Sequence, residues 1–198
     1  MVSVIAADVT PLLDESAFAE RLRALSQVRQ LRAGRYRFPK DRALSLGVGL
    51  LCDVYLSRLG LRERTSGFTY DAKGAPRFAA LPRIRVSLSH SGSVAAAAFC
   101  ESGKVGIDVE RVKPLTDAEF DIAARCFTAE EARALLAREA ERQSAMFFRL
   151  WTEKESLFKY NSETAARFFG FHKLFPGYAM TVCAAKESIV AEPDIALF

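Results

Sequence analysis

The sequence lacks the features that mark most membrane, secreted and disulfide-bonded proteins. It has no apolar run of eighteen or more residues, so we expect no transmembrane helix. Its first residues carry no basic region ahead of an apolar stretch, so no signal peptide is expected. The four cysteines are scattered without a Cys-x-x-Cys spacing, which favours reduced thiols over a disulfide framework or a zinc site. These absences predict a cytoplasmic protein.

Internal repeats and low-complexity linkers are absent as well. The chain has 198 residues, half of them hydrophobic, which is enough for one domain or for two small lobes that share a core. The net charge is +4, and arginine and lysine are dense between residues 21 and 42. Such a positive surface favours an acidic partner, nucleic acid or a phosphate-rich ligand. The alternative is an arginine-rich surface that only contacts solvent.

Hydrophobic periodicity and turn residues predict a mixture of helices and strands. The expected strands cover residues 2–7, 84–88, 94–99, 105–109 and 178–184. The expected helices cover residues 14–25, 40–59 and 142–160, and capping-box spacings start two more at Thr116 and Thr128. Turn residues predict hairpins within 68–79 and at 101–104. This order predicts an α+β fold, with two similar halves joined near residues 100–104.

The first chemically informative motif is Gly-Ile-Asp-Val-Glu at residues 106–110. Asp108 and Glu110 lie two residues apart in a strand, so they point to the same face of a sheet. Two carboxylates on one face repel each other unless a cation lies between them. Oxygen ligands of this kind suit Mg²⁺, which often completes its coordination with waters and substrate phosphates. The alternative is that both acids are solvated on an edge strand.

The second motif covers residues 151–159, Trp-Thr-Glu-Lys-Glu-Ser-Leu-Phe-Lys. Trp151, Glu155 and Lys159 are spaced i, i+4 and i+8, so they share one face of a helix. That face offers a third carboxylate and a positive charge. The alternative is a simple Glu155–Lys159 pair, worth ~0.3–0.5 kcal/mol on an exposed helix. Together the two motifs predict a divalent metal site that holds a phosphorylated substrate.

With these motifs placed, the chain resembles a 4′-phosphopantetheinyl transferase of the monomeric, surfactin-synthetase-activating type. The resemblance rests on Ser-Leu-Ser-His-Ser-Gly at 87–92, on the motifs at 105–110 and 151–159, and on their order along nearly the whole chain. Lys-Asp-Arg at 40–42 and Pro-Gly-Tyr at 176–178 support it. No single motif is specific, but the set at these separations is.

The resemblance implies two pseudo-symmetric α+β lobes, an N-terminal lobe of residues 1–100 and a C-terminal lobe of residues 101–198, with the active site in the cleft between them. It implies transfer of 4′-phosphopantetheine from coenzyme A to a serine hydroxyl of an apo acyl or peptidyl carrier protein. The reaction would depend on Mg²⁺, with Mn²⁺ as a substitute, and would release adenosine 3′,5′-bisphosphate. A monomer that acts on acidic carrier proteins, without nucleic acid or membrane partners, is expected.

The resemblance also implies roles for particular residues. Asp108, Glu110 and Glu155 would hold the metal, and Asp108, Glu155 and Lys159 would be catalytic, with Glu155 as general base and Lys159 against the phosphates. Ser89 and His90 would bind the 3′-phosphate of coenzyme A. The remaining contacts to coenzyme A would come from Lys40, Arg42, Lys73 and Lys159.

Two departures from the family pattern leave an alternative function open. The family's hairpin lysine is replaced by Ala75, with Lys73 or Arg77 as candidate substitutes. The segment 160–175 is short and aromatic, so the C-terminal lobe is expected to be shortened after Lys159. The alternative is therefore a non-catalytic homologue that binds coenzyme A or a carrier protein. A metal-dependent nuclease is disfavoured, because Asp108-Val109-Glu110-Arg111 lacks the carboxylate and lysine spacing of nuclease cores.

Overall fold

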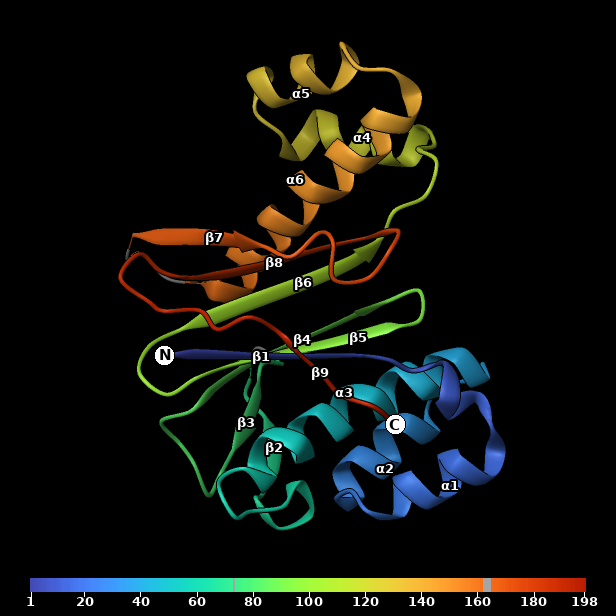
Figure 1. Ribbon diagram of the computed structural model, residues 1–198, viewed down its shortest axis with the longest axis vertical. Helices are drawn as coiled ribbons and strands as arrows, with labels where there is room; N and C mark the ends of the chain where they lie inside the picture. Colours follow the sequence, from blue (N-terminus) through green and yellow to red (C-terminus); the bar gives the residue numbers. More distant parts are fainter. Residues whose placement is uncertain (73, 162–164) are drawn as a thin grey trace.

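The computed structural model describes residues 1–72, 74–161 and 165–198, and these form an α+β fold (Figure 1). The strands are β1 Val2–Asp8, β2 Phe68–Tyr70, β3 Pro76–Phe78, β4 Arg85–Ser91, β5 Val94–Cys100, β6 Val105–Arg111, β7 Ala166–Gly170, β8 Tyr178–Ala185 and β9 Asp194–Ile195. The α-helices are α1 Glu15–Arg23, α2 Gln27–Gly34, α3 Pro39–Ser57, α4 Asp117–Cys126, α5 Ala129–Leu136 and α6 Ala140–Tyr160. None of these helices is long and apolar enough to cross a membrane, within the described residues.

The strands form two main sheets that face each other across an apolar core. One sheet has the order β4-β5-β1-β9 and the other β6-β8-β7, while β2 and β3 form a separate hairpin. The core between the sheets contains alternate residues of β1 and β5 on one side and of β6 and β8 on the other. Helix α3 covers the outer face of the first sheet, with α1 and α2 packed on the other side of α3, and α6 packs on β6 and β8 of the second sheet (Figure 1).

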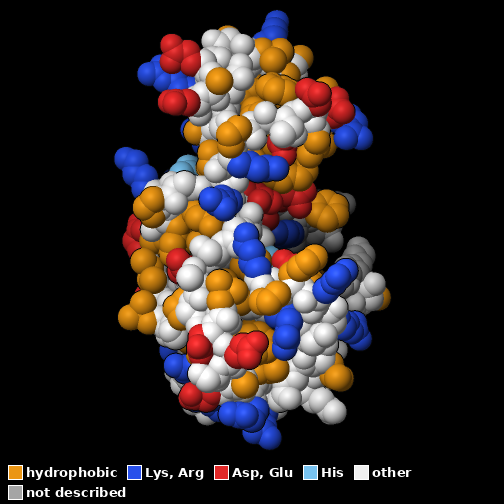
Figure 2. Space-filling view, turned by 90° about the vertical axis from the view of Figure 1, so that its right-hand side faces the viewer, with side chains coloured by type: hydrophobic (Ala, Val, Ile, Leu, Met, Phe, Trp, Pro, Cys, Tyr) orange, Lys and Arg blue, Asp and Glu red, His pale blue; other side chains and the backbone are white. Residues whose placement is uncertain are grey.

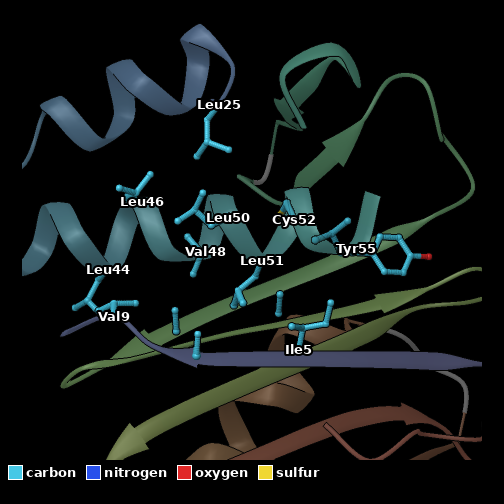
Figure 3. Close-up of a cluster of buried hydrophobic side chains, with 14 of the residues drawn as sticks. Ile5, Val9, Leu25, Leu44, Leu46, Val48, Leu50, Leu51, Cys52 and Tyr55 are labelled. Atoms are coloured by element: carbon cyan, nitrogen blue, oxygen red, sulfur yellow. The ribbon is translucent and has the colours of Figure 1, made fainter. Parts of the chain in front are cut away.

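Strand β5 is buried along its whole length because it has apolar neighbours on both faces. Its sequence, Val-Ala-Ala-Ala-Ala-Phe-Cys, supplies small side chains that let α3 and the second sheet approach closely. Helix α3 is likewise buried on two sides. Leu44, Val48 and Leu51 point toward the strands, whereas Leu46 and Leu50 point toward the other N-terminal helices (Figure 3). The helix therefore fixes the position of α2 relative to the first sheet.

A glycine sets the distance between β6 and α6. A Cβ atom on Gly106 would lie 1.9 Å from the carbonyl oxygen of Ser156 and 2.7 Å from the backbone nitrogen of Tyr160. Any side chain here would push the helix off the strand. The close approach places the C-terminal turn of α6 directly beside Asp108, two residues further along β6. The glycine of the first motif therefore serves to join it to the second motif.

Most of the predicted elements are confirmed, including the three long helices and the hairpin within 68–79. The hairpin expected at 101–104 is wrong, because β5 and β6 belong to different sheets. The strand expected at 84–88 runs on to Ser91, so Ser89 and His90 lie in a strand and the turn follows at Gly92. Helix α2 was not predicted, since it is short and buries only Arg29 and Ala33. Strand β7 lies in the aromatic segment where no strand was expected.

Candidate active site

Asp108 lies at the centre of the candidate site, buried between β6, β4 and α6. Its Oδ1 atom accepts hydrogen bonds from Lys159 Nζ at 2.6 Å and from Ser89 Oγ at 2.8 Å. Its Oδ2 atom is buried and has no hydrogen-bond partner within the described residues. A buried carboxylate oxygen left unpaired in this way is a costly arrangement, which a bound cation would relieve.

Glu110 and Glu155 add two further carboxylates near Asp108. Glu110 is half-buried and accepts a hydrogen bond from Ser91 Oγ at 2.6 Å. Burial raises the pKa of Glu110, and the negative charge of Asp108 raises it further. Burial is also the main cause of the raised pKa of Glu155, again with a contribution from Asp108. The three acids therefore share one electrostatic environment, in which negative charge is in excess.

Lys159 provides the positive charge of this environment. Its Nζ atom donates to Asp108 Oδ1 and, at 3.1 Å, to the carbonyl oxygen of Ile107. No three acidic, histidine or cysteine side chains in the described ranges already form a metal-binding geometry. The acids fit a Mg²⁺ ion by their chemistry and by the orphaned Oδ2 atom, and Lys159 is the group that partly neutralises them here.

A pocket of about 650 Å³ opens beside these acids. Asp108, Glu110 and Lys159 line one part of it, and His90 and the β2–β3 hairpin around Ala75 line another. The same pocket is also lined by basic and aromatic side chains from α2, from the loop that follows it and from the hairpin, namely Arg29, Arg32, Tyr36 and Tyr70. Figure 2 shows acidic side chains gathered at the narrow middle of the molecule, with basic side chains beside them. The pocket thus joins an acidic site to a basic one.

Arg29 is the most constrained residue of the basic part. It is buried, and its guanidinium donates to Tyr70 Oη and to the Ser45 carbonyl oxygen, both at 2.7 Å. Its Nε atom is buried without a hydrogen-bond partner in the described part of the chain. Arg32, three residues later on α2, lies over the Tyr70 ring with 4.5 Å between its Cζ atom and the ring centroid. Both arginines line the pocket, and guanidinium groups are well suited to contact an anion.

Arg29 and Arg32 were not predicted as site residues. The sequence signal was present but weak: Ser26 caps the N-terminus of α2, and the two arginines share a face at an i, i+3 spacing. The predicted residues Lys40 and Arg42 lie instead on the first turn of α3, outside the lining of this pocket. The guanidinium of Arg42 lies over the Phe18 ring, 4.8 Å from its centroid. The helix that presents arginines to the pocket is therefore α2.

The residues predicted to contact coenzyme A from the hairpin and from β4 have different surroundings in the structure. Lys73 lies outside the described residues. Arg77 pairs with Asp71 at 2.7 Å, and Ala75 lines the pocket at the position expected for the family's lysine. His90 lines the pocket on the outward side of β4, and burial, followed by the nearby Lys159, lowers its pKa. His90 and the position of Ala75 therefore face the same space as the arginines of α2.

Comparison with known proteins assigns the chain to a family. A family model described as the 4′-phosphopantetheinyl transferase superfamily matches residues 104–190. The 4′-phosphopantetheinyl transferase psf-1 of Bacillus pumilus is 34% identical over 160 residues, which cover 79% of this chain and 67% of that protein. HetI of Nostoc sp. is 32% identical over 158 residues, covering 77% and 66% of the two chains. Sfp of Bacillus subtilis is 28% identical over 166 residues, covering 71% and 72%.

The chain belongs to the 4′-phosphopantetheinyl transferase superfamily. The matches confirm the family, the type and the transferase class predicted from the sequence. The chain spans about two thirds of the length of the first two relatives.

Proposed function

We propose that this protein transfers 4′-phosphopantetheine from coenzyme A to a serine hydroxyl of an apo acyl or peptidyl carrier protein, in a reaction that depends on Mg²⁺ or Mn²⁺. The observation that carries the proposal is the pocket that joins Asp108, Glu110 and Lys159 to the arginines of α2. Coenzyme A has phosphates at two separate places, a diphosphate and a 3′-phosphate. A pocket with a metal-binding part and a basic part fits both.

In this proposal the diphosphate lies against the carboxylates and Lys159, and the 3′-phosphate lies against Arg29, Arg32 and His90. The residues of α2, β4 and the hairpin would belong to the N-terminal lobe of residues 1–100, and those of β6 and α6 to the C-terminal lobe of residues 101–198. The active site is then the cleft between the two lobes. The unpaired Oδ2 atom of Asp108 supports a cation at the acidic part, and the exposed Arg32 supports an anion at the basic part.

Asp108, Glu110 and Glu155 would hold the metal ion. When bound, the ion would stabilise the negative charge that develops on the phosphate oxygens. Lys159 already contacts Asp108 and would provide a second positive charge beside the substrate. The raised pKa values of Glu110 and Glu155 mean that both acids bind protons more readily than usual, so a metal ion would compete with protons for them.

The transfer is a single displacement at phosphorus. The serine hydroxyl oxygen of the carrier protein forms a bond to the phosphorus that bears pantetheine. The bond from this phosphorus to the bridging oxygen breaks, and that oxygen leaves as part of adenosine 3′,5′-bisphosphate. Glu155 accepts the serine proton, directly or through a water molecule. Lys159 compensates the charge on the leaving oxygen.

A second function is favoured by one observation. Ala75 faces the pocket where the family pattern has a lysine, so a protein that binds coenzyme A or a carrier protein without turnover is the alternative. In either case we expect a cytoplasmic monomer whose partner is an acidic carrier protein.

Mass spectrometry separates the two functions. Purified apo acyl and peptidyl carrier proteins are incubated with this protein, coenzyme A and Mg²⁺. A gain of one phosphopantetheine on the carrier serine, absent when Mg²⁺ is removed by a chelator, supports the transferase. Calorimetric binding of coenzyme A without any mass gain across the set of carrier proteins supports the non-catalytic alternative.

A further inference from the structure

A row of three serines on β4 lies along the open edge of β6. One edge of β6 pairs with β8, and no strand of the described residues joins the other edge within the same sheet. Along this open edge, the backbone nitrogens of Ile107, Val109 and Arg111 donate hydrogen bonds to the hydroxyl oxygens of Ser87, Ser89 and Ser91, at 3.0, 3.2 and 3.1 Å. Serine side chains here take the place of the backbone carbonyls of a neighbouring strand.

The same hydroxyls act as donors to the acids. Ser89 Oγ donates to Asp108 Oδ1 at 2.8 Å, and Ser91 Oγ donates to Glu110 Oε2 at 2.6 Å. Each of these serines therefore accepts from one backbone nitrogen of β6 and donates to the carboxylate of the preceding residue. Side chains two residues apart point to the same face of a strand, so the contacts of Ser89 recur at Ser91.

The third serine differs in one respect. Ser87 accepts from the backbone nitrogen of Ile107, but the preceding residue on β6 is Gly106, which has no side chain to receive its proton. Gly106 is constrained by its contact with α6, as described above. Ser87 thus makes the same backbone contact as Ser89 without touching an acid.

We propose that Ser89 and Ser91 are positioning residues that orient Asp108 and Glu110 for the metal ion, whereas Ser87 serves the junction between the sheets alone. Each hydroxyl occupies one oxygen of its carboxylate and fixes the rotation of the group. In Asp108 this leaves Oδ2 as the oxygen without a protein partner. The inference rests on the proposed function, because it assumes that the acids bind a metal.

Binding of Mn²⁺ tests the roles without measuring catalysis. Electron paramagnetic resonance of free Mn²⁺ gives the affinity of the wild-type protein and of the variants Ser87→Ala, Ser89→Ala and Ser91→Ala. Loss of groups that hold metal ligands in place weakens metal affinity about 10- to 100-fold. We expect this weakening for the variants at 89 and 91, but not at 87. Ser91→Thr, which keeps the hydroxyl, restores the affinity.

The outcomes are distinct. Equal Mn²⁺ affinity in all three alanine variants and the wild type overturns the inference while the metal site stands. Equal weakening in all three, including Ser87→Ala, assigns the serines to the sheet junction alone and also overturns it. Failure of the wild-type protein to bind Mn²⁺ overturns the proposed metal site itself. Ser91 is half-buried, so Ser91→Ala keeps the test decisive if Ser89→Ala does not fold, as judged by circular dichroism.

Discussion

The acidic and basic parts of the pocket are built in different ways. Asp108 and Glu110 come from one strand, Glu155 and Lys159 from one helix, and Gly106 brings these two elements into contact. The basic part instead combines α2 with the distant β2–β3 hairpin, and the bond from Arg29 to Tyr70 spans 41 residues of sequence. The bond from Lys159 to Asp108 spans 51 residues, so both parts are assembled by the fold. The difference is that the residues of the acidic part lie in two short motifs with strand and helix spacing. This comparison predicts that catalysis depends mainly on the acidic part and affinity for coenzyme A mainly on the basic part.

Removing one charge from the acidic part gives the largest expected effect. Asp108→Asn keeps the shape of the side chain but removes the negative charge that the metal and Lys159 share. We expect the rate of transfer to fall by about 100-fold or more, as is typical when a transition-state stabilising group is lost. The measurement is the rate of phosphopantetheine addition to an apo carrier protein by mass spectrometry.

Glu153→Gln is the matched control for this loss of charge. Glu153 lies on α6 near Glu155 but pairs with Arg149 at 3.4 Å. We expect its transfer rate to stay within about twofold of wild type, since surface ion pairs contribute little. A normal rate for Asp108→Asn would remove the acidic part from catalysis.

The acidic part was largely predictable from the sequence because its geometry follows from short spacings. Acids two apart on a strand share a face, and residues four apart on a helix do too. What the spacing could not show is that Ser89 contacts Asp108. The alternating serines were interpreted as an anion-binding turn, whereas the structure continues β4 through them.

For the basic part, the sequence predicted that an anion binds but not which residues contact it. The density of arginines between residues 21 and 42 indicated an anion, but not which arginines face it. Lys40 and Arg42 were chosen because they lie at the start of a long helix, where the helix dipole favours anions. The pocket beside the acids is lined by the neighbouring α2, which makes its arginines further candidates while Lys40 and Arg42 stay a prediction. Such a choice depends on helix packing, which no local pattern records.

The second prediction tests that choice. Arg32 is exposed and lines the pocket. Arg32→Ala should therefore lower the affinity for coenzyme A by roughly tenfold, because a charge-assisted hydrogen bond is lost, and it should have little effect on stability. Lys40→Ala, on an exposed position of α3, should leave the affinity within about twofold. Isothermal titration calorimetry with coenzyme A and with 3′-dephospho-coenzyme A measures both. A larger loss for Lys40→Ala would return the nucleotide site to the start of α3.

The third prediction concerns pH and the stability of the metal-free protein. Burial, and then the charge of Asp108, raises the pKa of Glu155 above its ordinary value. A raised pKa in the folded state means that this group favours folding at low pH, and that the contribution is lost as the pH rises through the raised pKa. Glu155→Gln should therefore raise the melting temperature near neutral pH, by about 1–4 °C, and not below the ordinary pKa of a carboxyl.

Mg²⁺ should reverse this difference, because the ion stabilises the wild-type site more than the variant. Differential scanning calorimetry across pH, with and without Mg²⁺, measures both effects. A stability difference that does not change with pH would show that Glu155 is not held in an environment that disfavours its charge.

The smallest expected effect comes from restoring a lysine to the basic part. Ala75 lines the pocket, and its backbone nitrogen donates to Asp71 Oδ1 at 2.9 Å, so the turn is fixed in place. Arg77 is already paired with Asp71. Ala75→Lys should therefore raise the affinity for coenzyme A a few-fold at low salt. This gain in affinity should shrink at higher salt, because salt screens a partly exposed charge. Calorimetric titration of wild type and variant at two salt concentrations measures this gain. If the affinity does not rise at low salt, the α2 arginines already supply the positive charge that coenzyme A binding needs, and the missing lysine at position 75 does not weaken binding.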